Sequence, residues 1–331
     1  MIDSLSRKLI NNFQGGFPLK AHPFEIIAKQ LSLGQATVEE TQVIETLGHL
    51  LGTGMLSRFG PLYDVAKLGG AFSLSAMQVP EDQFEKVTKV LNQIPEIAHN
   101  YRREHKLNMW FVVASDQYES IKTTLQSIEE KTGLKVYDFP KTQEFYVGLW
   151  LELEERGYVS TKAVPAKKTN ISYQADELDN KIIKATQSGL PLVNEPYQAI
   201  ALDLGLTEKV LLRRLKHMCD SGVIRRVGVV PNHYKLGLIS NGMSVWNVPD
   251  NKVTELGNKI GALDFVSHSY ERPRHLPLWP YNLFAMVHGE TKDEVHQKVA
   301  LIAGILGDSC DEYDVLFSSK ILKKTGMRLV A

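Results

Sequence analysis

Apolar and polar positions follow two periods in each half of the chain. In the second half, apolar residues recur with helical spacing from Leu178, where Asp179 or a neighbour is the expected cap. A short helix is expected over 197–204 and a longer one from Thr207 to Ser221. Three helices with a tight, glycine-containing turn before the third predict a helix-turn-helix.

The period then changes to the alternation typical of strands. In the second half, strands are expected at 223–230, 242–248, 265–272, 282–289 and 312–319, and helices at 250–261 and 291–306. In the first half, strands are expected near 72–79, 97–104, 109–114 and 136–153, and the third helix is expected to open with a capping box at Thr37-Val-Glu-Glu40. The order strand-helix-strand-strand-helix-strand predicts an α+β, ferredoxin-like sandwich.

The two halves are copies of one unit. When Leu5–Phe24 is placed on Leu178–Tyr197, 8 of 20 residues are identical. Two later motifs recur in the same order. Gly-x-x-x-Arg-x-Gly begins at Gly54 and Gly222, and His-x-Tyr-x-Arg begins at His99 and His268. The whole unit is therefore duplicated.

The duplication sets the expected domain boundaries. Helix-turn-helix domains are expected at 1–60 and 177–230, and sandwiches at 61–153 and 231–331. Residues 154–176 have the Gly, Pro, Lys, Ser and Thr content of a linker, which could let the copies pack as a pseudo-dimer within one chain. A further homodimer remains open.

Composition narrows the classes of protein. The chain has 38 Lys plus Arg and 38 Asp plus Glu, a balance that argues weakly against a DNA-binding protein. The two cysteines, Cys219 and Cys310, are far apart, so cysteine-based metal sites are not expected. The N-terminus lacks the pattern of a signal peptide and no apolar run has the length of a membrane span, so we expect a cytoplasmic protein.

A helix-turn-helix followed by such a sandwich resembles the Lrp/AsnC family of transcription regulators. The third helix of the first copy carries Glu39, Glu40 and Glu45 and has no Lys or Arg, although the second copy offers four basic residues there, namely Lys209, Arg213, Arg214 and Lys216. Acidic side chains repel phosphate, and a palindromic DNA site needs two matching helices. We therefore expect both helix-turn-helix units to be structural, with no nucleic-acid partner.

The chemistry is concentrated on the second strand of each sandwich. His99, Tyr101 and Arg103 share one strand face, and the second copy repeats this row with His268, Tyr270 and Arg272. Such a row is too polar for dry core, so it must line a cavity, an interface or a ligand site. The residues that follow each row add further candidates: His105, Asn108 and Trp110 in the first copy, and Arg274, His275, Trp279, Tyr281 and Asn282 in the second.

These residue types together favour a flat, iron-containing, polycarboxylated macrocycle. Arginine binds carboxylates, aromatic rings pack on flat apolar partners, and histidine takes protons or metal. A nucleotide would suit two of the three, but neither a Gly-x-Gly-x-x-Gly nor a Walker motif is present.

Two strings carry a sharper resemblance. His-Asn-Tyr-x-Arg-x-His-x-x-Asn-x-Trp-Phe from His99 is similar to one subunit of the siroheme decarboxylases, and His-x-Tyr-x-Arg-Pro…Trp-Pro-Tyr-Asn-Leu-Phe from His268 is similar to the partner subunit. The segments at Phe13 and Ser57 also resemble that family. The resemblance implies loss of two acetate carboxyl groups from siroheme, which gives 12,18-didecarboxysiroheme for heme d1 synthesis or the alternative route to heme.

The expected roles follow from this chemistry. His99, Tyr101, His268 and Tyr270 are candidate proton donors. Arg103, Arg272 and Arg274 are expected to hold carboxylates that do not react, because an arginine clamped on the departing carboxylate would stabilise the ground state. Trp110, Trp279 and Tyr281 are expected to wall the ring plane. His105, Asn108, His275 and Asn282 are expected to contact the substrate.

The iron arrives with the substrate, so no separate cofactor and no protein metal site are expected. One of His99, His105, His268 and His275 could instead ligate the substrate's iron. Two other functions stay open: a regulator that senses heme or an amino acid, and a carrier that binds a tetrapyrrole without changing it.

Overall fold

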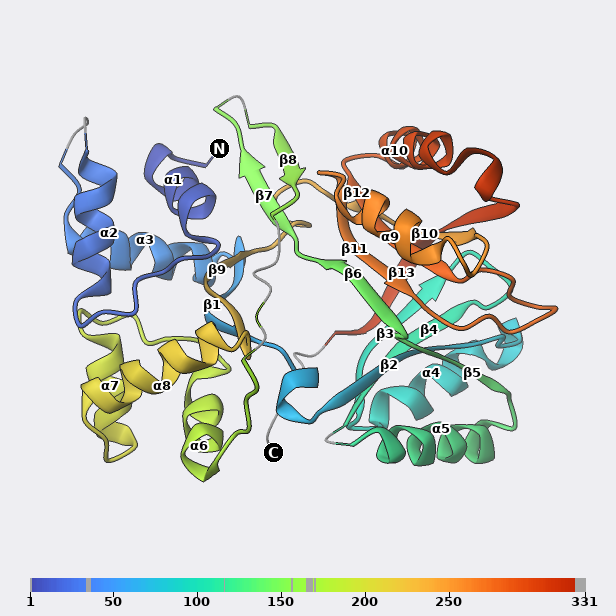
Figure 1. Ribbon diagram of the computed structural model, residues 1–331, viewed down its shortest axis with the longest axis horizontal. Coiled ribbons are helices and arrows are strands. Elements are labelled where there is room, and N and C mark those ends of the chain that lie inside the picture. Colours follow the sequence, from blue (N-terminus) through green and yellow to red (C-terminus); the bar gives the residue numbers. More distant parts are fainter. Residues whose placement is uncertain are drawn as a thin grey trace.

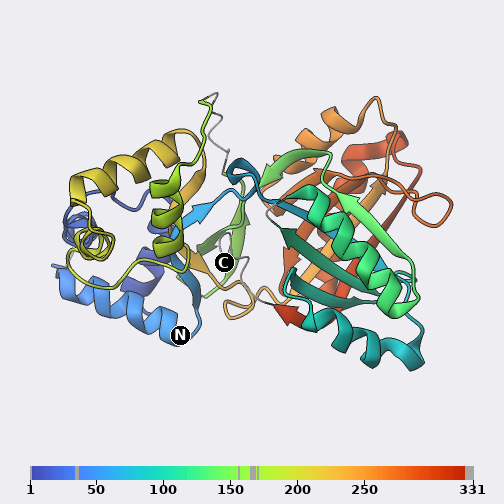
Figure 2. The same ribbon diagram turned by 90° about the horizontal axis from the view of Figure 1, so that it is seen from below.

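The computed structural model describes residues 2–33, 37–115, 117–155, 157–164, 169 and 171–324, which form two lobes (Figures 1 and 2). One lobe is mostly helical and the other is built from β-sheet with helices on its outer faces. Within these ranges, no helix has the length and apolar character that crossing a membrane requires.

The helical lobe contains three helices from each copy, as predicted. They are α1 (Ser4–Phe13), α2 (Pro23–Ser32) and α3 (Glu40–Gly52), and α6 (Glu177–Thr186), α7 (Pro196–Asp203) and α8 (Glu208–Asp220). All six pack on a single hydrophobic core to which both copies contribute, including Phe24, Phe59 and Tyr197. The two helix-turn-helix units are therefore one folding block.

The predicted cap of α3 is wrong by a few residues, and the cap predicted at or near Asp179 lies at Asp176. Helix α3 is capped by Glu39, whose N–H donates to Gln42 Oε1 at 2.8 Å, and Thr37 lies outside the helix. Helix α6 is capped by Asp176, which accepts from the N–H of Asp179 at 2.8 Å. In both cases a pair of side chains three residues apart satisfies the free N–H groups of the first turn, and this pairing sets the start of the helix.

The copies cross at two glycines. Strands β1 (Leu56–Tyr63) and β9 (Ile224–Pro231) pair antiparallel with Gly60 opposite Gly228, which places the pseudo-twofold axis between them. A Cβ on Gly228 would collide with the backbone of Phe13 and Gln14, and one on Gly60 would lie 3.1 Å from the Cα of Gly189. Close packing therefore explains the duplicated glycine motif. Strand β1 also runs across the boundary predicted at residue 60.

Each sandwich has the predicted ferredoxin-like order. The first contains β2 (Ala71–Met77), α4 (Phe84–Gln93), β3 (Ile97–Arg103), β4 (Met109–Ser115), α5 (Tyr118–Thr132) and β5 (Val136–Pro140). The second contains β10 (Ser240–Asn247), α9 (Val253–Gly261), β11 (Val266–Glu271), β12 (Leu283–Gly289), α10 (Lys292–Leu306) and β13 (Glu312–Lys324). The sheets run β5-β2-β4-β3 and β13-β10-β12-β11.

The last strand of each copy passes into the other sheet. Residues 312–317 of β13 pair with β10, and the rest of β13 pairs with β3 of the first copy. In the same way, β6 (Gln143–Val147), which follows β5, pairs with β11 of the second copy. The copies therefore share one nine-stranded sheet.

This exchange corrects three sequence predictions. The strand predicted at 136–153 is three strands, β5, β6 and β7 (Trp150–Leu153), because the chain leaves its own sheet after Pro140. The expected linker contains β8 (Val159–Lys162), which pairs with β7, while its Pro165 and Lys167-Lys168 lie outside the described residues. The last strand extends beyond 319 to Lys324, because its second half finds a partner in β3.

The inner faces of the two halves of the nine-stranded sheet, one from each copy, form the core between the copies. Trp110 and Phe139 of the first copy stack at 5.2 Å between ring centroids, and Trp279 of the second packs on both. Helices α4 and α5 cover the outer face of one sheet, and α9 and α10 cover that of the other. The space between the sheets is therefore reached by both copies.

Candidate functional site

Both His-Tyr-Arg rows lie on inner sheet faces, as predicted from their alternation. Within β3, the intervening Asn100 points toward α4 and donates to Asn92 at 3.2 Å. Within β11, Ser269 donates to the carbonyl of Gly257 in α9 at 3.0 Å. His99, Tyr101 and Arg103 (the first triad) and His268, Tyr270 and Arg272 (the second triad) therefore face the space between the sheets.

The arginine of each triad is buried without an anion. Arg103 and Arg272 are each 6% exposed. Each donates a guanidinium N–H to a backbone carbonyl of the other copy, Arg103 to Leu316 and Arg272 to Phe139, and each Nε is buried without a partner. Burial lowers the pKa of both to about 10, so both stay charged at neutral pH. Neither forms an ion pair with any described residue, so each leaves a positive charge uncompensated.

The first triad has free polar atoms. His99 Nδ1 is buried without a hydrogen-bond partner, and burial together with the charge of Lys324 lowers the pKa of this imidazole. The pKa of Tyr101 is raised, mainly by burial and to a smaller extent by the nearby phenol of Tyr234. Tyr234 comes from the second copy, in the loop after β9, so the first triad is completed by the other half of the chain.

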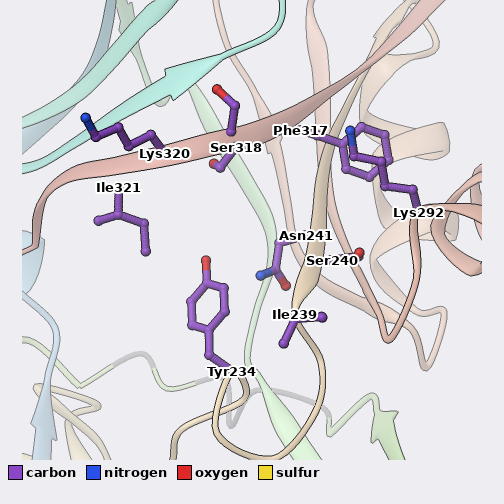
Figure 3. A pocket seen from close by; sticks show the side chains of 10 residues that line it. Tyr234, Ile239, Ser240, Asn241, Lys292, Phe317, Ser318, Lys320 and Ile321 are labelled. Atoms are coloured by element: carbon purple, nitrogen blue, oxygen red, sulfur yellow. The ribbon is translucent and has the colours of Figure 1, made fainter.

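A cavity of about 230 Å³ lies along β13, the strand that pairs with β3 of the first triad (Figure 3). Its wall includes Ser318 and Ile321 of β13, which are the sheet partners of Arg103 and Tyr101. Tyr234, Asn241 and Lys292 add to its polar lining. The amine of Lys292 lies 5.1 Å from the ring centre of Phe317 and 3.5 Å from Glu104, whereas the amine of Lys320 is turned away, toward Glu85 of α4 (Figure 3). The cavity therefore offers several hydrogen-bond donors.

The second triad faces a network of ion pairs. Glu144 of β6, the sheet partner of Tyr270, accepts from Lys141 and lies 3.3 Å from Arg225, which in turn lies 2.9 Å from Asp64. Although burial opposes ionisation of Glu144, these cations hold its pKa below the usual range. Burial also raises the pKa of Tyr270 and lowers that of His268 to about 4. Protein carboxylates therefore already lie beside this triad.

A buried hydrogen-bonded chain links His268 to the cavity of the first triad. Ser267 Oγ lies 2.8 Å from His268 Nδ1 and 2.7 Å from His288 Nε2. The other ring nitrogen of His288 bonds Oδ1 of Asn241, its cross-strand partner on β10. His288 is 4% exposed, and burial holds its pKa well below the usual range.

Comparisons with known proteins agree with the duplication. Residues 67–146 and 235–323 match the AsnC-like ligand binding domain, and 6–56 and 179–225 match the siroheme decarboxylase NirDL-like HTH domain. The chain is 54% identical over 154 residues to the siroheme decarboxylase NirH subunit of Paracoccus pantotrophus, which is 46% of this chain and 96% of that subunit. The chain belongs to the siroheme decarboxylase family.

Two further relatives extend this result. The siroheme decarboxylase NirG subunit of Pseudomonas aeruginosa is 45% identical over 152 residues, which cover 46% of this chain and 100% of that subunit. The crystal structure of the siroheme decarboxylase NirDL in co-complex with an iron-uroporphyrin III analogue has a TM-score of 0.70 and 27% identity, covering 97% of this chain and 92% of that one. The family's named activity is that of a carboxy-lyase.

Several residues that the sequence predicted to contact the substrate make hydrogen bonds that hold the decarboxylase fold together. Asn108 bonds both backbone groups of Val79, and Asn282 does the same with Val248. Arg274 is held by Asp250 and by the carbonyls of Pro280 and Val248. Their predicted contacts with the substrate stay predictions.

The predicted aromatic walls contact one another. Trp110 and Trp279 are fully buried, with 5.1 Å between their ring centroids, and Tyr281 packs on Trp279 while donating to Glu312. His105 packs edge-on against Trp279, and His275 Nε2 lies 2.7 Å from the carbonyl of Asp138. In the decarboxylase fold these side chains join the two copies, and their role at the substrate stays a prediction.

Five residues at or next to the candidate site were not predicted from the sequence. Tyr234, Asn241 and Lys292 line the cavity, and Ser267 and His288 belong to the hydrogen-bonded chain. None lies in a duplicated motif. The available signal was a histidine on a strand with an otherwise apolar inner face, and the strand pairing that places Asn241 opposite it. No cluster of three or more His, Cys, Asp or Glu able to hold a metal occurs in the described part of the chain.

Proposed function

We propose that this chain is a siroheme decarboxylase that converts siroheme to 12,18-didecarboxysiroheme, in heme d1 synthesis or in the alternative route to heme. Family membership supports this proposal, as does the relative solved with an iron-uroporphyrin III analogue. The observation that carries it is Arg103, a buried arginine without an anion on the strand that pairs with β13. A polycarboxylated macrocycle would supply the missing negative charge.

The first triad is the better substrate site. It lies beside the cavity, where Tyr234, Asn241 and Lys292 offer donors to carboxylate arms. At the second triad, Lys141 and Arg225 are already paired with Glu144 and Asp64, so these cations are not free to receive those arms. A volume of about 230 Å³ is below the range of roughly 300–1,000 Å³ usual for ligand pockets, so the macrocycle must also occupy the open surface beside the cavity.

The proposed chemistry is a proton delivery after loss of carbon dioxide. The bond from an acetate arm to its carboxylate breaks, the electron pair remains on the arm and is absorbed by the macrocycle, and a proton completes the new C–H bond. His99 and Tyr101 are the proposed proton donors, since they lie on the same face of β3 as Arg103, which holds the substrate. Arg103 holds a carboxylate that does not react.

The predicted roles of His268, Tyr270, Arg272 and Arg274 stay secondary proposals in this scheme. The iron belongs to the substrate, and we propose no further cofactor. Of the four histidines predicted as alternative iron ligands, His99 has an unpartnered Nδ1, whereas His275 lies against a backbone carbonyl.

The arrangement of partners is proposed from the duplication. NirH and NirG are named as subunits, and this chain joins two copies of the unit, so we propose that it acts as both subunits in one. We propose action in the cytoplasm without nucleic acid, with a further homodimer allowed. Among the basic residues predicted to be able to touch DNA, Arg214 already pairs with Asp176 and Asp179, and Lys216 with Asp220.

Anaerobic incubation of the purified chain with siroheme, followed by mass analysis of the tetrapyrrole, tests the function. Stepwise loss of two carboxyl groups is the expected result. Siroheme that is bound but unchanged would indicate a carrier, and no binding would favour a regulator.

A further inference from the structure

The cavity beside the first triad holds one side-chain amide in a defined orientation. Asn241 Oδ1 is bonded by His288, and Asn241 Nδ2 is buried without a partner. Asn241 also lines the cavity, in which its amide nitrogen is directed toward Tyr234 (Figure 3). A buried N–H donor without an acceptor is costly, which points to an acceptor that arrives with a ligand.

We propose that Asn241 donates its amide N–H to a carboxylate arm of the substrate and that the chain His288–Ser267–His268 fixes the amide in this orientation. The proposal rests on the proposed function for the identity of the ligand as a polycarboxylated tetrapyrrole. Asn241 is then a substrate-binding residue, and Ser267, His268 and His288 are positioning residues.

The three hydrogen bonds that link Asn241, His288, Ser267 and His268 have one consistent direction when the amide oxygen faces His288. Since Asn241 presents its oxygen to His288, the ring nitrogen of His288 that faces it must carry the proton. The other ring nitrogen, Nε2, then accepts from the Ser267 hydroxyl at 2.7 Å, and that hydroxyl oxygen accepts from His268 Nδ1 at 2.8 Å. Each bond therefore fixes the donor and acceptor roles of the next.

The opposite orientation of Asn241 would reverse all three bonds. His288 would then receive an amide N–H, and the amide oxygen would face the cavity, where it repels a carboxylate. Of the two directions, only the donor-inward one suits a carboxylate ligand. The hydrogen-bonded chain also connects the second triad to the first site, because His268 lies at its far end.

Anaerobic titration of siroheme into the purified chain, with KM and kcat measured in parallel, tests the proposal. Asn241→Asp keeps the shape but places a carboxylate in the cavity, so binding should weaken about tenfold or more while kcat changes less. Asn241→Ala serves as the second variant if the aspartate impairs folding, and should weaken binding by about three- to tenfold. Melting temperatures near that of the wild type show that folding is intact.

The positioning role is tested by a double-mutant cycle. If His288 acts through Asn241, His288→Ala should weaken binding in the wild type but add little in the Asn241→Ala background. Ser267→Ala should behave in the same way with a smaller effect. Additive losses, or unchanged siroheme affinity in both Asn241 variants, would overturn the inference. A wild-type chain that neither binds nor changes siroheme would instead overturn the proposed function.

Discussion

The two triads have the same residues in the same register on equivalent strands, yet their surroundings differ. The first lies beside a cavity with free donors, whereas the second lies against Glu144, Lys141 and Arg225. The neighbouring strand makes the difference, since β13 brings Ser318 and Ile321 to one triad and β6 brings Glu144 to the other. A duplicated motif therefore need not mean a duplicated site, because each copy is completed by a strand of the other.

The largest expected difference is in turnover. Tyr101→Phe and His99→Ala should each lower kcat by about 10²–10⁴-fold, the usual range for loss of a general acid. Tyr270→Phe is the matched control, and its kcat should stay within a few-fold of the wild-type value. Stopped anaerobic assays with mass detection of the product measure kcat for the variants of both triads. Equal losses at Tyr101 and Tyr270 would make both triads catalytic, and full turnover in the His99 and His268 variants would remove the acid assignment.

Substrate affinity should separate the arginines next. Arg103→Met should weaken siroheme binding by about a hundredfold, because the variant loses a buried charge that pairs with a carboxylate. Arg272→Met loses the equivalent carbonyl bond and should change affinity by less than tenfold. Equilibrium titration, with urea unfolding as a control for stability, distinguishes the two. An Arg103 variant with lost turnover but intact affinity would contradict its role as an anchor.

The pH dependence of stability should report the second triad. Burial lowers the folded-state pKa of His268 to about 4, so the unfolded chain binds the proton more readily. This contribution is complete above pH 6.5, the ordinary histidine value, and is lost as the pH falls from 6.5 toward 4. His268→Gln should therefore flatten the fall in unfolding free energy by at most about 1.4 kcal/mol per pH unit. Urea midpoints at pH 7.5, 6 and 5 measure the slope, and parallel curves for the two proteins would contradict a buried neutral imidazole.

The smallest effect is expected at the ion-pair network. Glu144 has a folded-state pKa below 4.5, so its contribution to stability is present above pH 4.5 and is lost as the pH falls through the folded value. Glu144→Gln should cost about 1 kcal/mol at pH 7 and nothing at strongly acidic pH. Its siroheme affinity should not fall, since the network adjoins the second triad. A large loss of affinity in this variant would place the substrate there.

Local patterns predicted most of the fold. The helices, the two ferredoxin-like orders and the placement of each triad on one strand face follow from periodicity and from the repeat. The exchange of β6 and of the end of β13 between copies could not be predicted, because strand pairing between distant segments leaves no local signature. The linker, interpreted from its turn-forming residues, also contains β8 for this reason.

The candidate site was predicted less completely. The triads were found because they occur twice. Asn108 and Asn282 were predicted because they follow the triads in sequence, and in the structure each fastens a hairpin to its sheet. Asn241 and Tyr234 line the cavity but were missed because neither lies in a duplicated motif. Repetition identifies what both copies need, whereas the proposed substrate site depends on where the copies differ.

The exchange of β13 also has a consequence for synthesis of the protein. Strand β3 is made early, but its neighbour is the last described segment of the chain, residues 318–324. Until the ribosome completes that segment, β3 is an unprotected sheet edge, and Arg103 lacks its carbonyl partner on Leu316. The first sandwich therefore cannot complete its sheet until β13 has been synthesised, and until then the nascent chain exposes an edge on which chaperones or other nascent chains can act.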